Sequence, residues 1–227
     1  MVRTVLFAAS LILFLAHAPF AAAQSATDSD RRWSVVPQIG FGSLGWRWQQ
    51  TGEGNVESRV GPGNSPMFAA ALHFDPPGRA AYEVLVGLIS TDYAADFIDH
   101  GEVTHKIRGE GGIRLLRVAG SMMFRMREGA PGYFTVGAGA LHYTPTTPFV
   151  ISQNPEAVLA DETQWMPSVH AGLGIDLGES KNPIRVDARV YASRPGQEEI
   201  ALPGGSAYKA RSVAFDFAVS IGYVVRF

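Results

Sequence analysis

Apolar or small residues occupy every second position in eight separate segments of this chain. The segments cover residues 35–41, 68–74, 82–88, 116–126, 133–143, 169–177, 184–190 and 215–227. Alternation with a period of two predicts β-strands that have one apolar face and one small or polar face. In the segment 133–143, the face that begins at Phe134 is expected to be the apolar one, because Gly137 and Gly139 suit a crowded interior.

The connections between these segments alternate between short and long. Short turns rich in Pro and Gly are expected at residues 75–79, 128–132 and 178–183. Long loops are expected at residues 43–66, 91–113, 144–164 and 193–211. Because neighbouring strands then run in opposite directions, the turns gather at one end of the sheet and the loops at the other. The sequence therefore predicts an all-β protein with eight antiparallel strands in up-and-down order.

The first residues are typical of a secretory signal. Arg3 is followed by an uninterrupted apolar run from Val5 to Ala16, and small residues at 21–23 precede Gln24. This order is that of a cleaved signal peptide, and the apolar run is shorter than the ~20 residues of a membrane-spanning helix. We therefore predict a signal peptide at residues 1–23 and one exported barrel domain at residues 24–227.

Charged side chains are confined to one face of the predicted strands. The apolar faces carry no Asp, Glu, Lys or Arg. The opposite faces carry Asp75, Glu83, Asp176, Asp187 and Asp216 together with Arg117, Arg125, Arg127, Arg185, Arg189 and Arg226. A small soluble barrel would show the reverse, with apolar side chains inside. A sheet can cross a membrane only when it closes on itself, so we predict an eight-stranded transmembrane β-barrel in the outer membrane of a Gram-negative-type bacterium.

Composition excludes several other classes of protein. The 227 residues include no Cys, so disulfides and thiolate metal sites cannot form. The 19 basic residues are balanced by 21 acidic ones, which leaves no excess of positive charge for nucleic acid. No phosphate-cradling Gly loop and no nucleophile elbow occurs in the sequence. We expect no cofactor and no nucleic-acid partner.

The C-terminal segment resembles the signal by which outer-membrane barrels are recognised for assembly. Tyr223, Val225 and Phe227 are the matching residues, at alternate positions back from the last phenylalanine. The eight-strand layout is similar to that of the small OmpA, OmpX and OmpW barrels. The resemblance implies a monomeric barrel whose partners are outer-membrane lipid, lipopolysaccharide and the barrel assembly machinery.

The inward-facing charges are the first candidate for function. The predicted lumen network comprises Glu83, Arg117, Arg125, Arg185, Asp187, Arg189 and Asp216. Similar heights on adjacent strands favour a pair between Glu83 and Arg125, and the charges of the seventh strand can meet Asp216. Near-equal numbers of opposite charges favour a polar plug in a protein with a structural or surface-interaction role. A narrow channel for small or hydrophobic solutes, as in OmpW, is the alternative that the resemblance implies.

The long loops provide two further candidates. Cations expected at or near the outer rim can pair with lipopolysaccharide phosphates; they are Arg47, Arg59, Lys106, Arg108, Arg194, Lys209 and Arg211. The second loop contains the metal-ligating residue types Asp96, Asp99, His100, Glu102 and His105. Because their spacing matches no defined site, no metal site is predicted.

A lipid A-modifying enzyme is the second alternative. His142 and Thr144 share the expected lipid-facing side of the fifth strand, and Glu162 precedes the sixth. The outer-membrane deacylase family resembles this arrangement with a His-x-Ser pair and a Glu. Here Thr replaces Ser and the pair lies two strands earlier, so we expect a protein that is not an enzyme.

Overall fold

The computed structural model describes residues 33–51, 57–99, 102–127, 130–147, 149–150, 158–159, 163–178, 182–196, 199–201 and 207–227. The predicted signal peptide lies outside the described residues. Within the described part of the chain, no helix is long and apolar enough to cross a membrane. The regular elements described below are all β-strands.

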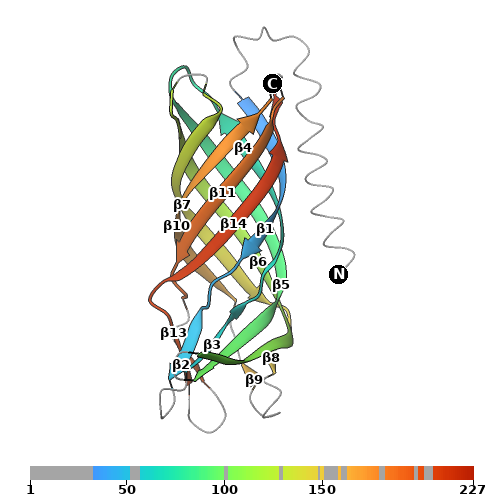
Figure 1. The fold of residues 1–227 in the computed structure, drawn as a ribbon, viewed down its shortest axis with the longest axis vertical. Coiled ribbons are helices and arrows are strands. Elements are labelled where there is room, and N and C mark those ends of the chain that lie inside the picture. Colours follow the sequence, from blue (N-terminus) through green and yellow to red (C-terminus); the bar gives the residue numbers. More distant parts are fainter. Residues whose placement is uncertain are drawn as a thin grey trace.

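Eight long strands close into a barrel (Figure 1). They are β1 (Trp33–Ser43), β4 (Ser65–Phe74), β5 (Ala80–Asp99), β6 (Glu102–Arg125), β7 (Gly132–Pro145), β10 (Gln164–Leu177), β11 (Ile184–Ser193) and β14 (Ala214–Tyr223). The antiparallel order is β5-β4-β1-β14-β11-β10-β7-β6, and β6 pairs with β5 to close the circle. The predicted eight-stranded up-and-down barrel is confirmed. β15 (Val225–Arg226) continues the last strand along β1.

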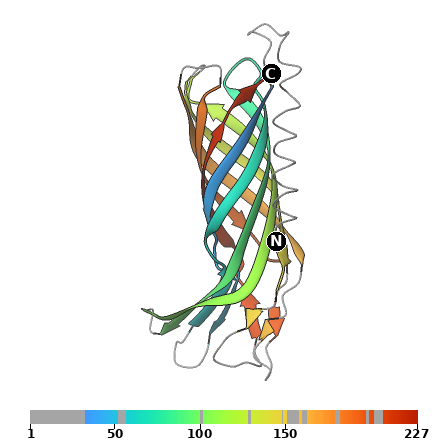
Figure 2. The same cartoon turned by 90° about the vertical axis from the view of Figure 1, so that its right-hand side faces the viewer.

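The strands of the barrel are strongly staggered. Followed from partner to partner around the barrel, the ladder that starts at Trp33 returns to β1 at Ser43, ten residues further along. Such a stagger requires strands tilted by about 35–45° from the barrel axis, and Figure 2 shows the tilt. Because the stagger exceeds the ~8 residues of an eight-stranded TIM barrel, this interior is wider and can hold long Arg and Tyr side chains.

The outer face of the eight barrel strands is apolar. The predicted apolar faces point outward, and residues such as Phe215 and Leu173 are 63 % and 62 % exposed. On β7, Phe134 is exposed and Tyr133 is buried, so the predicted orientation of this strand is correct. Val35 is an exception on β1, because it is buried. A continuous apolar belt therefore surrounds the strands.

The short connections and the C-terminus lie together at one end of the barrel, which we call the turn rim (Figure 1). Two of these connections contain Gly78 and Gly178, with φ of 118° and 101°. This left-handed backbone is disfavoured for residues with a Cβ and favours glycine. The turns therefore occur where the Pro and Gly pattern predicts them.

At the opposite end, which we call the hairpin rim, the segments expected to be long loops contain strands. β5 and β6 continue as one extended hairpin, with register shifts between Asp92 and Ala94 and between Phe97 and Ile98. The other connections contain β2 (Trp48–Thr51), β3 (Glu57–Pro62), β8 (Phe149–Val150), β9 (Val158–Leu159), β12 (Glu199–Ala201) and β13 (Ala207–Ala210). The long connections are thus present, but the sequence pattern did not predict their strands, because cross-strand pairing satisfies the backbone of segments that show no apolar alternation.

Strands from different hairpins form one sheet beyond the barrel, in the order β12-β13-β2-β3-β5-β6. We call it the extension sheet. One row of cross-strand neighbours contains Glu199, Lys209, Gln49 and Arg59. The adjacent row contains Trp48 and Val60, which are fully buried. Among the described residues, the polarity of the wall is therefore inverted along the barrel axis. The belt is apolar outside and charged inside, whereas the described side chains of the extension sheet are polar outside and apolar inside.

Candidate functional site

The interior of the barrel holds three groups of charged side chains at successive heights. In the group nearest the turn rim, Asp176 accepts hydrogen bonds from Arg185 at 2.6 and 2.9 Å and from Arg125 at 3.3 Å. Arg125 also pairs with Asp75 at 3.3 Å, and a ring nitrogen of His73 lies 3.0 Å from Arg185. Since the side chain of Asp75 is 35 % exposed, this group extends to the rim.

The middle group centres on Glu83 and Arg189. Both terminal nitrogens of Arg189 donate to the carboxylate of Glu83, which makes a bidentate pair. Ser121 donates to the same carboxylate at 3.0 Å, and Nε2 of His73 lies 3.3 Å from it. Asp187 accepts a further hydrogen bond from Arg189 at 3.3 Å. All five side chains are buried, so these charges are paired away from water.

In the third group, toward the hairpin rim, two arginines share one carboxylate. Asp216 accepts from Arg47 at 2.8 and 2.9 Å, from Arg117 at 2.8 Å and from the backbone N–H of Gly45 at 3.0 Å. The guanidinium carbon of Arg117 lies 3.6 Å from the ring centre of Tyr191, a cation–π contact. Nε and Nη1 of both arginines have no hydrogen-bond partner among the described residues. Two buried positive charges therefore depend on one negative charge.

Apolar side chains pack next to these charged groups. Toward the hairpin rim a buried cluster includes Leu44, Trp48, Tyr93 and Tyr143. The hydroxyl of Tyr143 donates to that of Tyr93 at 2.8 Å, and Trp48 packs edge-on against Tyr143 at 5.7 Å between ring centres. A second apolar cluster on the β1–β4–β5 side includes Leu85. In the cluster toward the hairpin rim, side chains from facing walls therefore meet across the interior.

Comparisons with known proteins agree with this geometry at the level of fold. No protein-family model matches the chain, and a search of curated proteins finds no match. Among solved structures, the outer membrane protein OprG from Pseudomonas aeruginosa aligns with a TM-score of 0.56 and 9% identity, over 87% of this chain and 98% of OprG. The outer membrane protein AlkL aligns with a TM-score of 0.50 and 16% identity, over 90% of this chain and 93% of AlkL.

The chain has the fold of an eight-stranded outer-membrane barrel. The barrel places the residues of the predicted lumen network in its interior, and all of them except Arg125 are buried. Two of the predicted pairs are wrong. Glu83 binds Arg189 rather than Arg125, since in the register Glu83 lies opposite Ser121 and Arg125 lies nearer to the turn rim.

Asp216 also binds other partners than predicted. It pairs with Arg47 and Arg117 rather than with the charges of β11. Arg47 was expected to pair with lipopolysaccharide phosphates near the outer rim. This prediction is wrong, because the side chain of Arg47 is fully buried and pairs with Asp216 in the interior. Between β1 and β2 the strand is interrupted at residues 44–47. There the backbone N–H of Arg47 donates to the carbonyl of Val60 at 3.0 Å. Alternation cannot predict the direction of a side chain across such a break.

Glycines on β7 and β10 of the barrel make room for the polar interior. Gly137 lies against the ring of His170, Gly172 against Arg189 and Gly174 against the ring of Tyr133. A Cβ at any of these positions would overlap the neighbouring side chain. The hydroxyl of Tyr133 donates to Asp187 at 2.6 Å. The small residues that the sequence places on this face therefore accommodate the hydrogen-bonded side chains of the lumen.

The remaining candidates lie on the outer face or outside the described residues. Thr144 Oγ1 lies 3.2 Å from Nδ1 of His142, whose ring centre is 4.5 Å from that of Trp165. Glu162 lies outside the described residues, as do the side chains of the second loop's metal-ligating types. Within the part that the structure describes, no group of three or more His, Asp or Glu could hold a metal ion. At the C-terminus, the backbone N–H of Phe227 donates to the carbonyl of Trp33 at 3.0 Å.

Proposed function

We propose that this protein is an integral outer-membrane barrel with a structural and surface-interaction role, and that it is not an open pore. The observation that supports this function best is the inversion of polarity between the belt and the extension sheet. An apolar belt around a charged interior is stable only in apolar surroundings, because exposing so large a patch to water forfeits the hydrophobic effect. Beyond the hairpin rim the described outer residues, such as Lys209 and Glu199, are polar, as expected for a wall surrounded by water.

We assign the turn rim to the periplasm and the hairpin rim to the cell exterior. Barrels of this class have short periplasmic turns and longer extracellular connections. β14 has 10 residues, within the ~9–11 that a tilted strand needs to cross a bilayer. Aromatic side chains occur at both ends of the belt, with Trp33 against Phe74 at the turn rim and Trp165 toward the hairpin rim. The alternating C-terminal residues fit recognition by the assembly machinery; they are Tyr223, Val225 and Phe227.

The membrane assignment predicts heat modifiability. After refolding into detergent, the protein is expected to migrate differently on a gel before and after boiling, because a closed barrel keeps its backbone pairing in detergent until it is heated. A sample left unfolded in urea is the control and should show a single position. A protein that stays dispersed and monomeric without detergent would contradict the assignment.

The paired interior supports a plug rather than a conduit. Buried pairs such as Glu83 with Arg189 lie in the interior, and separating them to let ions pass would expose uncompensated charge in a medium of low dielectric constant. The protein is therefore expected to insert into planar bilayers without conductance steps, while a large porin in the same bilayer provides the positive control. A steady conductance would support the alternative, a narrow channel for small solutes.

We propose a structural role, and no catalytic one, for His142 and Thr144. Their side chains hydrogen-bond to each other at the hairpin-rim edge of the belt, and the imidazole packs against Trp165. Amphipathic rings at this height suit the boundary between hydrocarbon and lipid headgroups. The contact with Trp165 supports a part in anchoring the barrel at that boundary.

A further inference from the structure

We propose that a cavity at the hairpin rim, bounded by Arg194, Lys209 and Arg211, binds a phosphate monoester. The cavity has a volume of about 370 Å³ and is also lined by Glu199 and Ser212. It opens between the end of β11 and the β12–β13 hairpin. This volume is within the range of small-molecule sites. The inference rests on the proposed placement of the barrel in an outer membrane.

The cavity lies next to the apolar belt, at the hairpin-rim end. Arg211 alternates with Val213 and Phe215 along the chain, and both of these apolar residues are exposed on the outer face. Arg194 follows the end of β11, and Val190 of the same strand is exposed in the adjoining part of the belt. The cationic groups are therefore placed at the height where acyl chains end and lipid headgroups begin.

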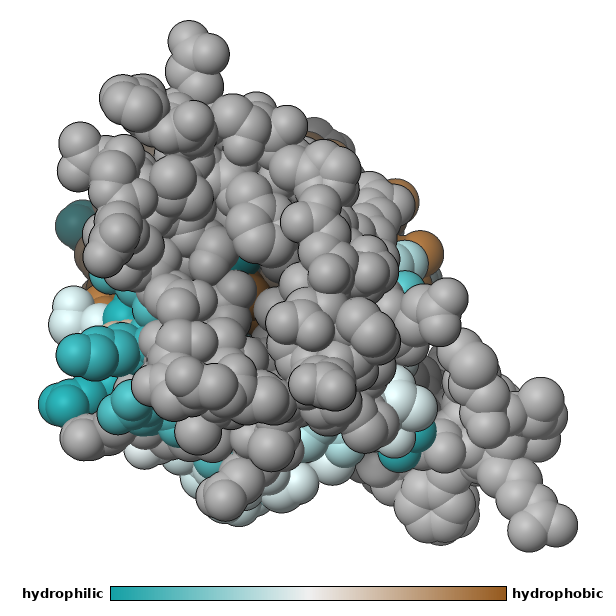
Figure 3. Space-filling model, turned by 90° about the horizontal axis from the view of Figure 1, so that it is seen from below, coloured by the Kyte–Doolittle hydropathy of each residue, from teal (hydrophilic) through white to brown (hydrophobic). Residues whose placement is uncertain are grey.

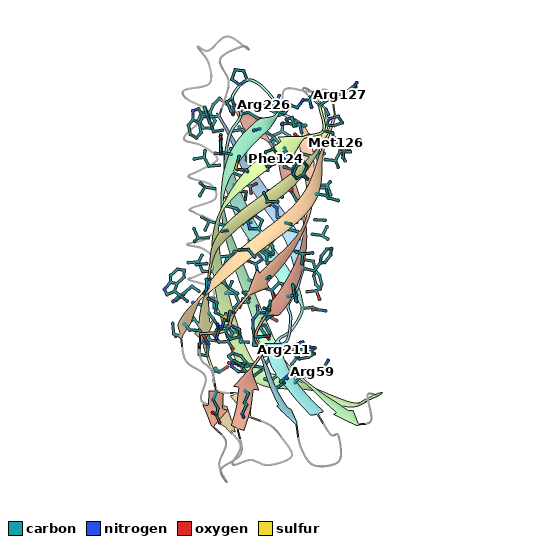
Figure 4. The ribbon with its side chains drawn as sticks, turned by 90° about the vertical axis from the view of Figure 1, so that its left-hand side faces the viewer. Arg59, Phe124, Met126, Arg127, Arg211 and Arg226 are labelled. Atoms are coloured by element: carbon teal, nitrogen blue, oxygen red, sulfur yellow. The ribbon has the colours of Figure 1, made fainter. Side chains whose placement is uncertain are left out.

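The described side chains on the outer face of the hairpin rim are predominantly positive. The outer face of the hairpin rim also carries Arg59 and Arg114, and its acidic side chains among the described residues are Asp92 and Glu199. Figure 4 shows Arg59 and Arg211 at the same level, where the barrel strands give way to the hairpins. Figure 3, which looks onto this end, shows hydrophilic described residues gathered along one side. The local excess of cations favours an anionic ligand.

The three cations differ in a way that suits a phosphate. Guanidinium groups bind phosphate oxygens in a planar, bidentate manner, whereas the ammonium of Lys209 acts as a point charge. The backbone at two of these positions is tied to the barrel: the N–H of Arg211 donates to the carbonyl of Arg47 at 2.9 Å, and that of Arg194 to the carbonyl of Pro167 at 3.4 Å. Neither Lys209 nor Arg211 forms an ion pair with a carboxylate in the described part of the chain. Lys209 and Arg211 therefore carry charges that are not paired with a described carboxylate, and these charges are available to a ligand.

Two sources can supply this phosphate chemistry: the headgroup of a phosphorylated glycolipid in the outer leaflet, and free phosphate. They are distinguished with the full-length protein in phosphatidylcholine nanodiscs. One set of nanodiscs contains bisphosphorylated lipid A, a second contains the same lipid after removal of its phosphates, and a third receives inorganic phosphate instead. Bound ligand is counted by native mass spectrometry.

The double variant Lys209→Gln with Arg211→Gln is expected to bind the phosphorylated probe at least about tenfold more weakly than the wild type, since two charge-assisted hydrogen bonds are lost. The matched control is Arg79→Gln with Arg127→Gln, which removes the same charge from exposed positions at the turn rim and should bind as the wild type does. Figure 4 shows Arg127 at that rim. Lys209→Arg is expected to retain binding. Lys209→Gln alone serves if the double variant does not fold.

The arms separate the possible outcomes. A lipid headgroup site is supported if the protein prefers bisphosphorylated lipid A over the dephosphorylated lipid and the double variant Lys209→Gln with Arg211→Gln loses this preference. An equal loss of binding for inorganic phosphate supports the same site with a soluble ligand. If the Lys209/Arg211 double variant and the Arg79/Arg127 double variant bind the phosphorylated probe equally, the proposed site is wrong. Heat modifiability of each sample tests the membrane barrel separately, so a folded, inserted protein without selective binding overturns only this inference.

Discussion

Replacing Asp216 by alanine is expected to lower the free energy of unfolding by about 3–5 kcal/mol. Arg47 and Arg117 both pair with this carboxylate and are themselves buried. Removal of Asp216 leaves two guanidinium charges in a medium of low dielectric constant with no counter-charge of their own. Urea unfolding of the protein in lipid vesicles, followed by tryptophan fluorescence, measures the change.

Two variants show whether the loss comes from the unpaired charges. Asp92→Ala removes an exposed acid at the hairpin rim and is expected to change the free energy of unfolding by no more than about 0.5 kcal/mol. The combination Arg47→Met, Arg117→Leu and Asp216→Leu is expected to recover most of the stability, because packed apolar side chains can replace a buried ion group at little cost. Equal losses in the Asp92 and Asp216 variants would argue against a stabilising role for the third group.

An arginine at Val219 is the second change with a large expected effect. Val219 lies on the outer face near the middle of β14 and is 40 % exposed. If the belt faces hydrocarbon, a positive charge at its midplane costs about 2–4 kcal/mol. The free energy of unfolding in lipid vesicles should therefore fall by that amount.

The control for this experiment uses the depth of the residue in the bilayer. Val213 is also exposed on the outer face, but it immediately precedes β14 beside the hairpin rim. Val213→Arg is expected to cost only about 0–1 kcal/mol, because the side chain reaches the headgroup region. If the two arginines cost the same, the belt does not sit in a bilayer at the proposed depth.

The barrel follows from local properties of the chain. Alternation with a period of two specifies which side chain of each strand points outward, because successive residues of a strand face opposite sides. The Phe134 face of β7 is an example, since Phe134 is exposed and Tyr133 buried as predicted. Turn chemistry at Gly78 and Gly178 separates the strands where the Pro and Gly pattern indicates.

Ion-pair partners such as Glu83 and Arg189 could not be predicted from the sequence, because their pairing depends on distances between residues far apart in the chain. Glu83 and Arg189 are 106 positions apart and meet only when the stagger and curvature of the closed sheet bring β5 and β11 to facing sides of a narrow interior. Arg47 turns inward at a break in its strand, where no period constrains it.

The same division holds at the hairpin rim. Segments expected to be loops become the extension sheet by pairing between β2 and β13, which belong to opposite ends of the sequence. Their residues show no apolar alternation that a sequence pattern could reveal. The order of apolar and polar residues was thus sufficient for the barrel and its belt, since each strand carries that information locally. The pairing of Glu83 with Arg189 and the extension sheet required closure of the barrel, since only closure brings their distant residues together.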